Sequence, residues 1–262
     1  MDHDVLEYYE RGEERDRLAT GGWLEFARTK EVLERFLPPP PARVLDVGGG
    51  PGAYAAWLAA RGYDVHLVDP VPLHVEQARA AAAGTFTVAA GDARRLDEGD
   101  ASCAAVLLLG PLYHLPERAE RLTALREARR AVAPGGIVAA AAISRFASLF
   151  DGFARRLFLD REFLPIVERD LRDGQHRNAS DRPHAFTTAF FHHPHELAAE
   201  VADAGLSLRA LVGVEGPGGW FAEADDPPEL RERLVSAARA VEAEPTLLGA
   251  SAHLLAIAQR VD

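Results

Sequence analysis

Cysteine is almost absent from this sequence, with Cys103 as the only one among 262 residues. A single cysteine excludes an intramolecular disulfide and a multi-cysteine metal site, so we expect a protein of a reducing compartment, the cytoplasm. No secretory signal is visible, because the first residues are charged and lack an apolar stretch. The longest apolar runs, such as Ile137–Ile143, are far shorter than the ~20 residues of a membrane span. We therefore expect no membrane partner.

Positive charge is also scarce, since 29 Lys and Arg face 40 Asp and Glu, which gives a formal net charge of −11. This excess of negative charge repels the phosphate backbone of nucleic acids, so we expect no nucleic-acid partner. Hydrophobic residues make up 48% of the chain, which is enough for a substantial core. The length fits one large domain or two small ones.

Short apolar runs alternate with helical stretches along most of the chain. The expected strands are Arg43–Val47, Asp64–Val68, Thr85–Ala89, Ala104–Leu109, Gly136–Ser144, Leu206–Val214 and Ala252–Gln259. Strands separated by helices of this size indicate βαβ units and an α/β fold with a parallel, doubly wound sheet. Both faces of such a sheet are covered, which explains why the strands do not alternate with polar residues.

Two segments depart from this alternation. Residues 1–40 are helical and polar, and the run Pro38–Pro41 ends them, so we expect an N-terminal helical cap on a domain of residues 41–262. Residues 145–190 combine an aromatic helix with the polar loop Asp173–His184. They follow the fifth strand at the carboxyl edge of the sheet, where ligands of open α/β sheets bind. We expect a mobile lid that, together with the N-terminal cap, determines which substrate is accepted.

The most informative segment is the glycine-rich turn from Val44 to Gly52, with the sequence VLDVGGGPG. A strand enters, glycines allow a tight turn close to a ligand, and a helix follows, so backbone N–H groups can face a nucleotide. Gly48, Gly50 and Ala53 also satisfy the dinucleotide fingerprint. The turn by itself therefore leaves a nicotinamide dinucleotide and another nucleoside both open.

Three carboxylates bear on that choice. Asp69 ends the second strand, where a carboxylate accepts both ribose hydroxyls in either case. Asp46 lies inside the first strand, where a dehydrogenase usually has an apolar residue and a buried carboxylate is costly unless a ligand uses it. Asp92 follows the third strand, where it can accept from an adenine amino group. Asp46 and Asp92 both disfavour a nicotinamide cofactor.

The segments VLDVGGGPG, LVDP, GDARRL and LLLGPLYHL occur in this order over residues 42–144. In this arrangement the chain resembles the class I S-adenosylmethionine-dependent methyltransferases, and most of all the small-molecule branch that includes the quinone-biosynthesis enzymes. The resemblance implies a Rossmann-like sheet of seven strands, mostly parallel with one antiparallel. It also implies S-adenosyl-L-methionine as cofactor, S-adenosyl-L-homocysteine as product and a small molecule as methyl acceptor.

The same resemblance assigns the cofactor-binding residues by position. They are Asp46, Gly48, Gly49, Gly50, Gly52, Asp69, Pro70, Asp92, Ala93, Leu109 and Gly110. The glycines would lie along the methionine part, with Asp46 near its amino group. Asp69 would hold the ribose, Asp92 and Ala93 the adenine, and the last two residues would flank the departing methyl group.

The free carboxylate of such a cofactor needs a cationic partner. Arg28 lies on an N-terminal helix, and a bidentate arginine suits a carboxylate, so we predict this contact, with Arg15 as the alternative. We also expect Tyr8 and Tyr9 to close the mouth of the substrate pocket. We also predict that Phe150, in the lid, lines the substrate pocket.

The sequence from Gly110 to His114 occupies the position of the family's fourth motif. Methyltransferases that act on exocyclic or amide nitrogen often carry Asp/Asn-Pro-Pro-Tyr/Phe there, whereas this chain has Gly110 and Leu112 in place of the first and third residues. This departure disfavours a nucleic-acid amine or glutamine as acceptor. Tyr113 and His114 remain as catalytic candidates, and His114 is a candidate general base because its ordinary pKa is near neutral.

Histidines are concentrated near position 193, with His192, His193 and His195 together and His176 and His184 upstream. No HExxH spacing is present, so we expect no metal site and predict instead that His192 and His193 line the substrate pocket.

Together these observations predict a methyltransferase that acts on O, N or C of a small molecule. A nicotinamide-dependent oxidoreductase and a non-catalytic cofactor-binding regulatory protein are the alternatives. The sequence leaves the acceptor and the oligomeric state open.

Overall fold

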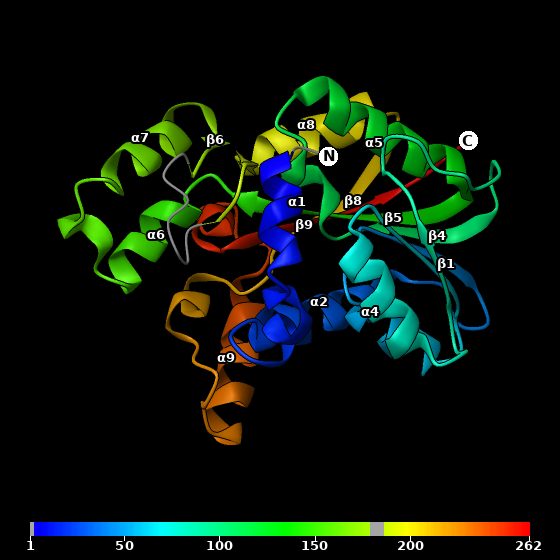
Figure 1. The fold of residues 1–262 in the computed structure, drawn as a ribbon, viewed down its shortest axis with the longest axis horizontal. Coiled ribbons are helices and arrows are strands. Elements are labelled where there is room, and N and C mark those ends of the chain that lie inside the picture. The colour runs from blue at the N-terminus through cyan, green and yellow to red at the C-terminus, as the bar shows by residue number, and fades with distance from the viewer. Residues whose placement is uncertain (1–2, 179–185) are drawn as a thin grey trace.

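The computed structural model describes residues 3–178 and 186–262 (Figure 1). A central sheet carries helices on both faces. Its parallel strands are β1 (Arg43–Val47), β2 (Asp64–Asp69), β3 (Thr87–Ala90), β4 (Cys103–Leu108) and β5 (Val132–Ser144), in the spatial order 3-2-1-4-5. The strand order reverses between β1 and β4, which is where an open α/β sheet offers a crevice for a ligand.

The far side of the sheet is completed by two strands from the end of the chain. β9 (His253–Gln259) runs antiparallel to both β5 and β8 (Ser207–Gly213). The predicted seven-stranded, mostly parallel sheet with one antiparallel strand is confirmed. A short hairpin of β6 (Gln175–His176) and β7 (Ala189–His192), which the sequence analysis did not predict, extends the sheet beside the end of β5.

Alternate residues of each strand enter cores on opposite faces of the sheet. On one face, Leu45 and Val47 pack with α5 (Arg118–Ala131) and α8 (Pro194–Asp203). On the other face, Val44 packs with three helices. These are α2 (Trp23–Phe36), α3 (Ala53–Ala59) and α4 (Pro72–Ala82). Side chains of successive strand residues point to opposite faces of the sheet, so the two cores take alternate residues of the same strand.

The N-terminal segment has two different parts. α2 belongs to the sheet's own helical layer, because Val32 and Leu33 are fully buried in the core of that face. α1 (His3–Glu10) and the 3-10 helix η1 (Glu13–Ala19) instead approach the carboxyl edge of the sheet, where the Tyr9 hydroxyl lies 2.6 Å from Nε2 of His114. The part of residues 1–40 that can cover a ligand is therefore α1 and η1.

The predicted lid insertion contains α6 (Ala147–Ala154), the 3-10 helix η3 (Leu157–Leu159) and α7 (Leu164–Asp173), which extend beyond β5 in Figure 1. Asp170 holds these pieces together, because its Oδ2 accepts from the Ser148 hydroxyl (2.5 Å) and from Nδ1 of His176 (2.8 Å). Residues 179–184 of the predicted loop lie outside the described residues, and the mobility of the lid stays a prediction.

Three further 3-10 helices and one α-helix complete the described chain. They are η2 (Pro111–His114), η4 (Pro217–Phe221), η5 (Leu248–Ala250) and α9 (Pro228–Val241). Over the described residues, no helix has both the length and the apolar character needed to cross a membrane.

Candidate functional site

The glycine-rich turn after β1 brings the chain close to the turn after β4. Gly48 and Gly50 have φ values of 68° and 56°, a backbone conformation that favours glycine. A Cβ on Gly48 would lie 2.7 Å from Cγ of Pro111, so a side chain there would collide with the second turn. The sequence therefore keeps glycine where two strand ends form the crevice.

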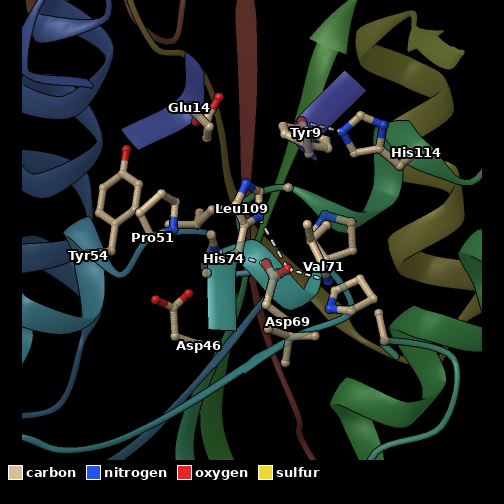
Figure 2. Close-up of a pocket in the computed structure, with 18 of the residues that line it drawn as sticks. Tyr9, Glu14, Asp46, Pro51, Tyr54, Asp69, Val71, His74, Leu109 and His114 are labelled. Carbon is tan, nitrogen blue, oxygen red and sulfur yellow. Dashed lines mark hydrogen bonds and ion pairs between the residues drawn. The ribbon is translucent and has the colours of Figure 1, made fainter. Parts of the chain in front are cut away.

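Asp69, at the end of β2, is held rigidly against this turn (Figure 2). Its Oδ2 accepts the N–H of Gly50 at 2.9 Å, and its Oδ1 accepts the N–H of Val71 at 2.9 Å. Nδ1 of His74 lies 3.3 Å from Oδ1. Each carboxylate oxygen can accept two hydrogen bonds, so Asp69 keeps acceptor capacity for a ligand.

Asp46 lies in β1 just before the glycines, and its surroundings are different. Its side chain is fully buried, and within the described residues neither of its oxygens has a hydrogen-bond partner. Burial, together with the negative charge of Asp69, raises the pKa of Asp46 to about 7, opposed only in part by the nearby backbone N–H of Ala55, which does not reach hydrogen-bond geometry. A buried carboxylate without partners destabilises the fold, which points to a ligand that supplies the missing contacts.

We expect Asp46→Asn to alter the pH dependence of stability. Because the folded-state pKa of about 7 exceeds the ordinary 3.8, the folded protein binds a proton that the unfolded chain has lost between these pH values. Wild-type stability therefore falls as pH rises through this window. Urea unfolding should give similar stabilities near pH 4, with the variant more stable by on the order of 3 kcal/mol at pH 8. A stability difference that is constant across pH would contradict this expectation.

Asp92 follows β3, as the sequence analysis expected, but its carboxylate already has a partner. Arg94 donates from its backbone N–H and from Nε to Oδ1, both at 2.9 Å, and from Nη2 to Oδ2 at 2.6 Å. These bonds lower the pKa of Asp92. An adenine amino group would have to share this carboxylate with Arg94.

Most of the predicted cofactor residues surround one cavity, which we call the first cavity. They are Asp46, Gly48, Gly49, Gly50, Asp69, Pro70, Asp92, Ala93, Leu109 and Gly110. Gly52 does not line the first cavity. Its lack of a side chain allows the turn to pack closely against Phe86 and Ala78. A Cβ there would lie 3.2 Å from the Phe86 ring and 3.5 Å from Cβ of Ala78.

The prediction for Arg28 is wrong. Its side chain is fully buried, its Nη1 and Nη2 donate to Glu31 and Glu242, and its Nε donates to the Val214 carbonyl at 3.3 Å. These contacts join α2 to the C-terminal part of the chain and leave the guanidinium away from the cavity.

Two arginines of η1, Arg15 and Arg17, line the first cavity instead. Arg17 is held between Glu14 and Glu25, with Nε 2.8 Å from one oxygen of Glu14 and Nη1 2.5 Å from Oε2 of Glu25. Arg15 is the alternative that the sequence analysis retained, and the lining of the cavity supports it.

Tyr113 and His114 lie on η2 at the wall of the first cavity. The Tyr113 hydroxyl donates to the Leu109 carbonyl at 3.3 Å, and burial raises its pKa. Burial lowers the pKa of His114 to about 4, so its imidazole is neutral at pH 7. The Tyr9 hydroxyl at Nε2 fixes the orientation of this ring.

A second cavity adjoins the first and shares Tyr9, Glu14, Arg17 and Tyr113 with it. Much of its wall is aromatic or aliphatic and comes from α1, the end of β5, β7, the lid and η4. These residues include Tyr8, Ile143, Phe163, Phe186, Phe191 and Trp220. Tyr8 and Tyr9, which the sequence predicts at the mouth of the substrate pocket, line this second cavity. The arrangement offers a largely apolar compartment next to the first cavity.

Three predicted pocket residues lie elsewhere. His192 is fully buried and its Nε2 contacts Glu200 at 3.2 Å, in a cluster between β7 and α8. His193 caps α8, where its backbone N–H donates to Glu196. Phe150 does not line the second cavity but stacks on Trp220, which does, with ring centroids 5.6 Å apart.

Comparison with known proteins adds family and fold information. Residues 44–136 match a family model described as a methyltransferase domain. An uncharacterized methyltransferase of Mycobacterium tuberculosis is 32% identical over 162 residues, which cover 62% of this chain and 60% of that protein. The match thus spans about three fifths of the length of this curated relative.

Solved structures share the fold at low sequence identity. A SAM-dependent methyltransferase of Methanosarcina mazei aligns with a TM-score of 0.60 and 19% identity, over 88% of this chain and 97% of that one. The cyclase SpnF aligns with a TM-score of 0.55 and 17% identity, over 88% of this chain and 80% of its own. The chain has the Rossmann-like fold of these proteins, and because a cyclase shares it, chemistry must be argued from the site.

Proposed function

We propose that this protein is a methyltransferase that transfers the sulfonium methyl group of S-adenosylmethionine to O, N or C of a small molecule. The observation that carries the proposal is Asp46, whose fully buried oxygens have no partner among the described residues. This carboxylate lies beside the glycine-rich turn and faces the first cavity. An ammonium group, such as that of a methionine moiety, would supply both charge and hydrogen bonds there.

The other residues of the first cavity fit the remaining parts of the cofactor. Asp69 has acceptor capacity left for ribose hydroxyls, and Asp92 with Ala93 would face the adenine. Arg15, rather than Arg28, would pair with the cofactor's carboxylate. The matching methyltransferase domain covers residues 44–136, which include Asp69, Asp92 and Ala93.

The bound cofactor supplies an activated methyl group, so the protein's work is to align an acceptor and to exclude water. The aromatic second cavity can hold the acceptor directly beside the first cavity. His114 has a pKa of about 4, so it is too weak a base to ionise a hydroxyl group beforehand.

An apolar, aromatic compartment supports a small-molecule acceptor and agrees with the resemblance to the quinone-biosynthesis branch. The net charge of −11 supports the absence of a nucleic-acid partner. The positive nitrogen of an oxidised nicotinamide ring carries no N–H group, so it cannot offer Asp46 the charged hydrogen bonds that an ammonium group can.

Calorimetric titration tests the proposal. We expect S-adenosylhomocysteine to bind the wild-type protein, with no detectable heat from NAD or NADP, because only the former brings an ammonium group to Asp46. Tight binding of NAD with no heat from S-adenosylhomocysteine would overturn the assignment. Binding of S-adenosylhomocysteine by a protein that transfers no methyl group to a broad acceptor panel would favour the regulatory alternative.

A further inference from the structure

His253 is a cavity residue that the sequence analysis did not single out. It is the first residue of β9 and pairs with Ile143 near the end of β5. Because β9 is antiparallel to β5, its first residue reaches the carboxyl edge of the sheet, where the cavities open. The His253 side chain is 21% exposed and lines the second cavity.

A buried carboxylate fixes the ring of His253. Glu215 contacts Nδ1 through Oε1, while its Oε2 accepts the His253 backbone N–H at 3.0 Å and the Ser251 hydroxyl at 2.8 Å. Oε2 of Glu25 lies 3.8 Å from the same Nδ1. These two carboxylates outweigh burial and raise the pKa of His253 to about 9, so the ring is an imidazolium at pH 7.

Nε2 of this imidazolium has no hydrogen-bond partner within the described residues. Since Nδ1 is used by Glu215, the Nε2–H is the donor that remains for a molecule in the second cavity. The neighbouring carboxylates are already occupied, because Arg17 binds Glu14 and Glu25 and His253 binds Glu215. The cluster therefore presents a charged donor rather than a free acceptor.

Glu25, Glu215 and His253 also bring three metal-ligating atoms within 4.8 Å of one another. A metal ion would have to displace Arg17 from Glu25 and remove a proton from His253. The same geometry suits an oxygen ligand without either rearrangement.

We propose that His253, positioned by Glu215, binds an oxygen atom of the methyl acceptor through Nε2–H. The second cavity has an apolar wall that includes Ile143, Phe191 and Trp220, and its charged side chains Asp151 and Arg155 pair with each other, so the acceptor is an aromatic or apolar molecule with a hydroxyl, carbonyl or carboxylate oxygen. This inference rests on the proposed function and narrows its substrate class. An amine in place of the oxygen would meet a positive charge.

The test uses two variants that separate the nitrogens of the ring. His253→Asn keeps a donor near the position of Nδ1 and removes Nε2, whereas His253→Gln places a neutral amide near Nε2. The probes share one ring and differ in one group, and they are phenol, benzoate, benzylamine and toluene. Each is titrated into protein saturated with S-adenosylhomocysteine, and binding is followed by NMR of histidine-labelled protein.

We expect phenol and benzoate to shift the His253 resonances, and His253→Asn to weaken their binding about tenfold or more. His253→Gln should retain phenol better than benzoate, because it restores a donor without the charge. His195→Asn, at an exposed position of α8, is the matched control and should bind both probes as the wild type does.

Equal binding of phenol and benzoate by wild type and His253→Asn would overturn the inference, as would tighter binding of benzylamine or no binding of either oxygen probe. Thermal melting and S-adenosylhomocysteine affinity, measured for each variant, confirm that it is folded. Failure of S-adenosylhomocysteine to bind the wild type would contradict the proposed function instead, and probe titration of the free protein would still test His253.

Discussion

Asp69→Ala is expected to weaken S-adenosylhomocysteine binding by about 30- to 700-fold, which corresponds to about 2–4 kcal/mol. The carboxylate would accept one ribose hydroxyl at Oδ2 and a second at Oδ1 in place of the 3.3 Å contact with Nδ1 of His74, and both charge-assisted hydrogen bonds disappear in the variant. It also orders the site, because it accepts the N–H groups of Gly50 and Val71 at 2.9 Å each. Calorimetry at a temperature where the variant is folded measures the loss.

Cys103→Ser provides the control, because Cys103 is buried at the start of β4, whereas the cavity lies at the ends of the strands. Its S-adenosylhomocysteine affinity should equal that of the wild type even if its melting temperature changes. Equal affinities in the two variants, both folded, would show that Asp69 does not contact the cofactor.

The sequence predicts the first cavity well because its information is local. Asp69 ends β2, Asp46 lies one residue before the end of β1, the glycines follow directly after β1, and the parallel arrangement brings these strand ends to one edge. Neither carboxylate needs a distant residue to be recognised. The same locality explains why the strands of residues 42–144 lie close to their predicted positions.

Residues with distant partners were harder to predict. Arg28 finds Glu242 and the Val214 carbonyl more than 180 positions along the chain, so a helix face that looks solvated is in fact a buried contact. His253 acquires its role from the register of β9 against β5 and from Glu215. Neither spacing nor residue type in the local sequence indicates these pairings.

The histidines near position 193 show a third limit. The segment Ala189–His192 pairs with only the last two residues of β5, which is too short a contact for a periodic signal. This strand buries His192, whose ring meets Glu200 of α8, and Arg121 binds the same carboxylate at 2.7 Å. These contacts join α5 to α8, whereas the sequence predicted that His192 lines the substrate pocket.

Arg28→Met separates the two roles considered for Arg28. If the arginine held the cofactor, the variant would lose affinity and keep its stability, whereas its buried contacts predict the opposite. Removing one partner of a buried ion pair costs about 3–5 kcal/mol. We expect the lower end of that range, because Glu242 keeps Arg35 at 2.6 Å and Glu31 keeps Arg239 as partners.

Urea unfolding of Arg28→Met should therefore show a free energy of unfolding lower by about 3 kcal/mol, while the S-adenosylhomocysteine affinity of the folded variant stays at the wild-type value. Arg35→Met is the matched control, because Arg35 binds the same Glu242 but its side chain is 39% exposed. An exposed pair of this kind contributes about 1 kcal/mol or less. Wild-type stability combined with a large loss of affinity in Arg28→Met would place Arg28 in the cofactor site after all. The two measurements distinguish the roles of Arg28, because loss of a buried ion pair lowers the free energy of unfolding, whereas loss of a contact in the cavity lowers the affinity for S-adenosylhomocysteine.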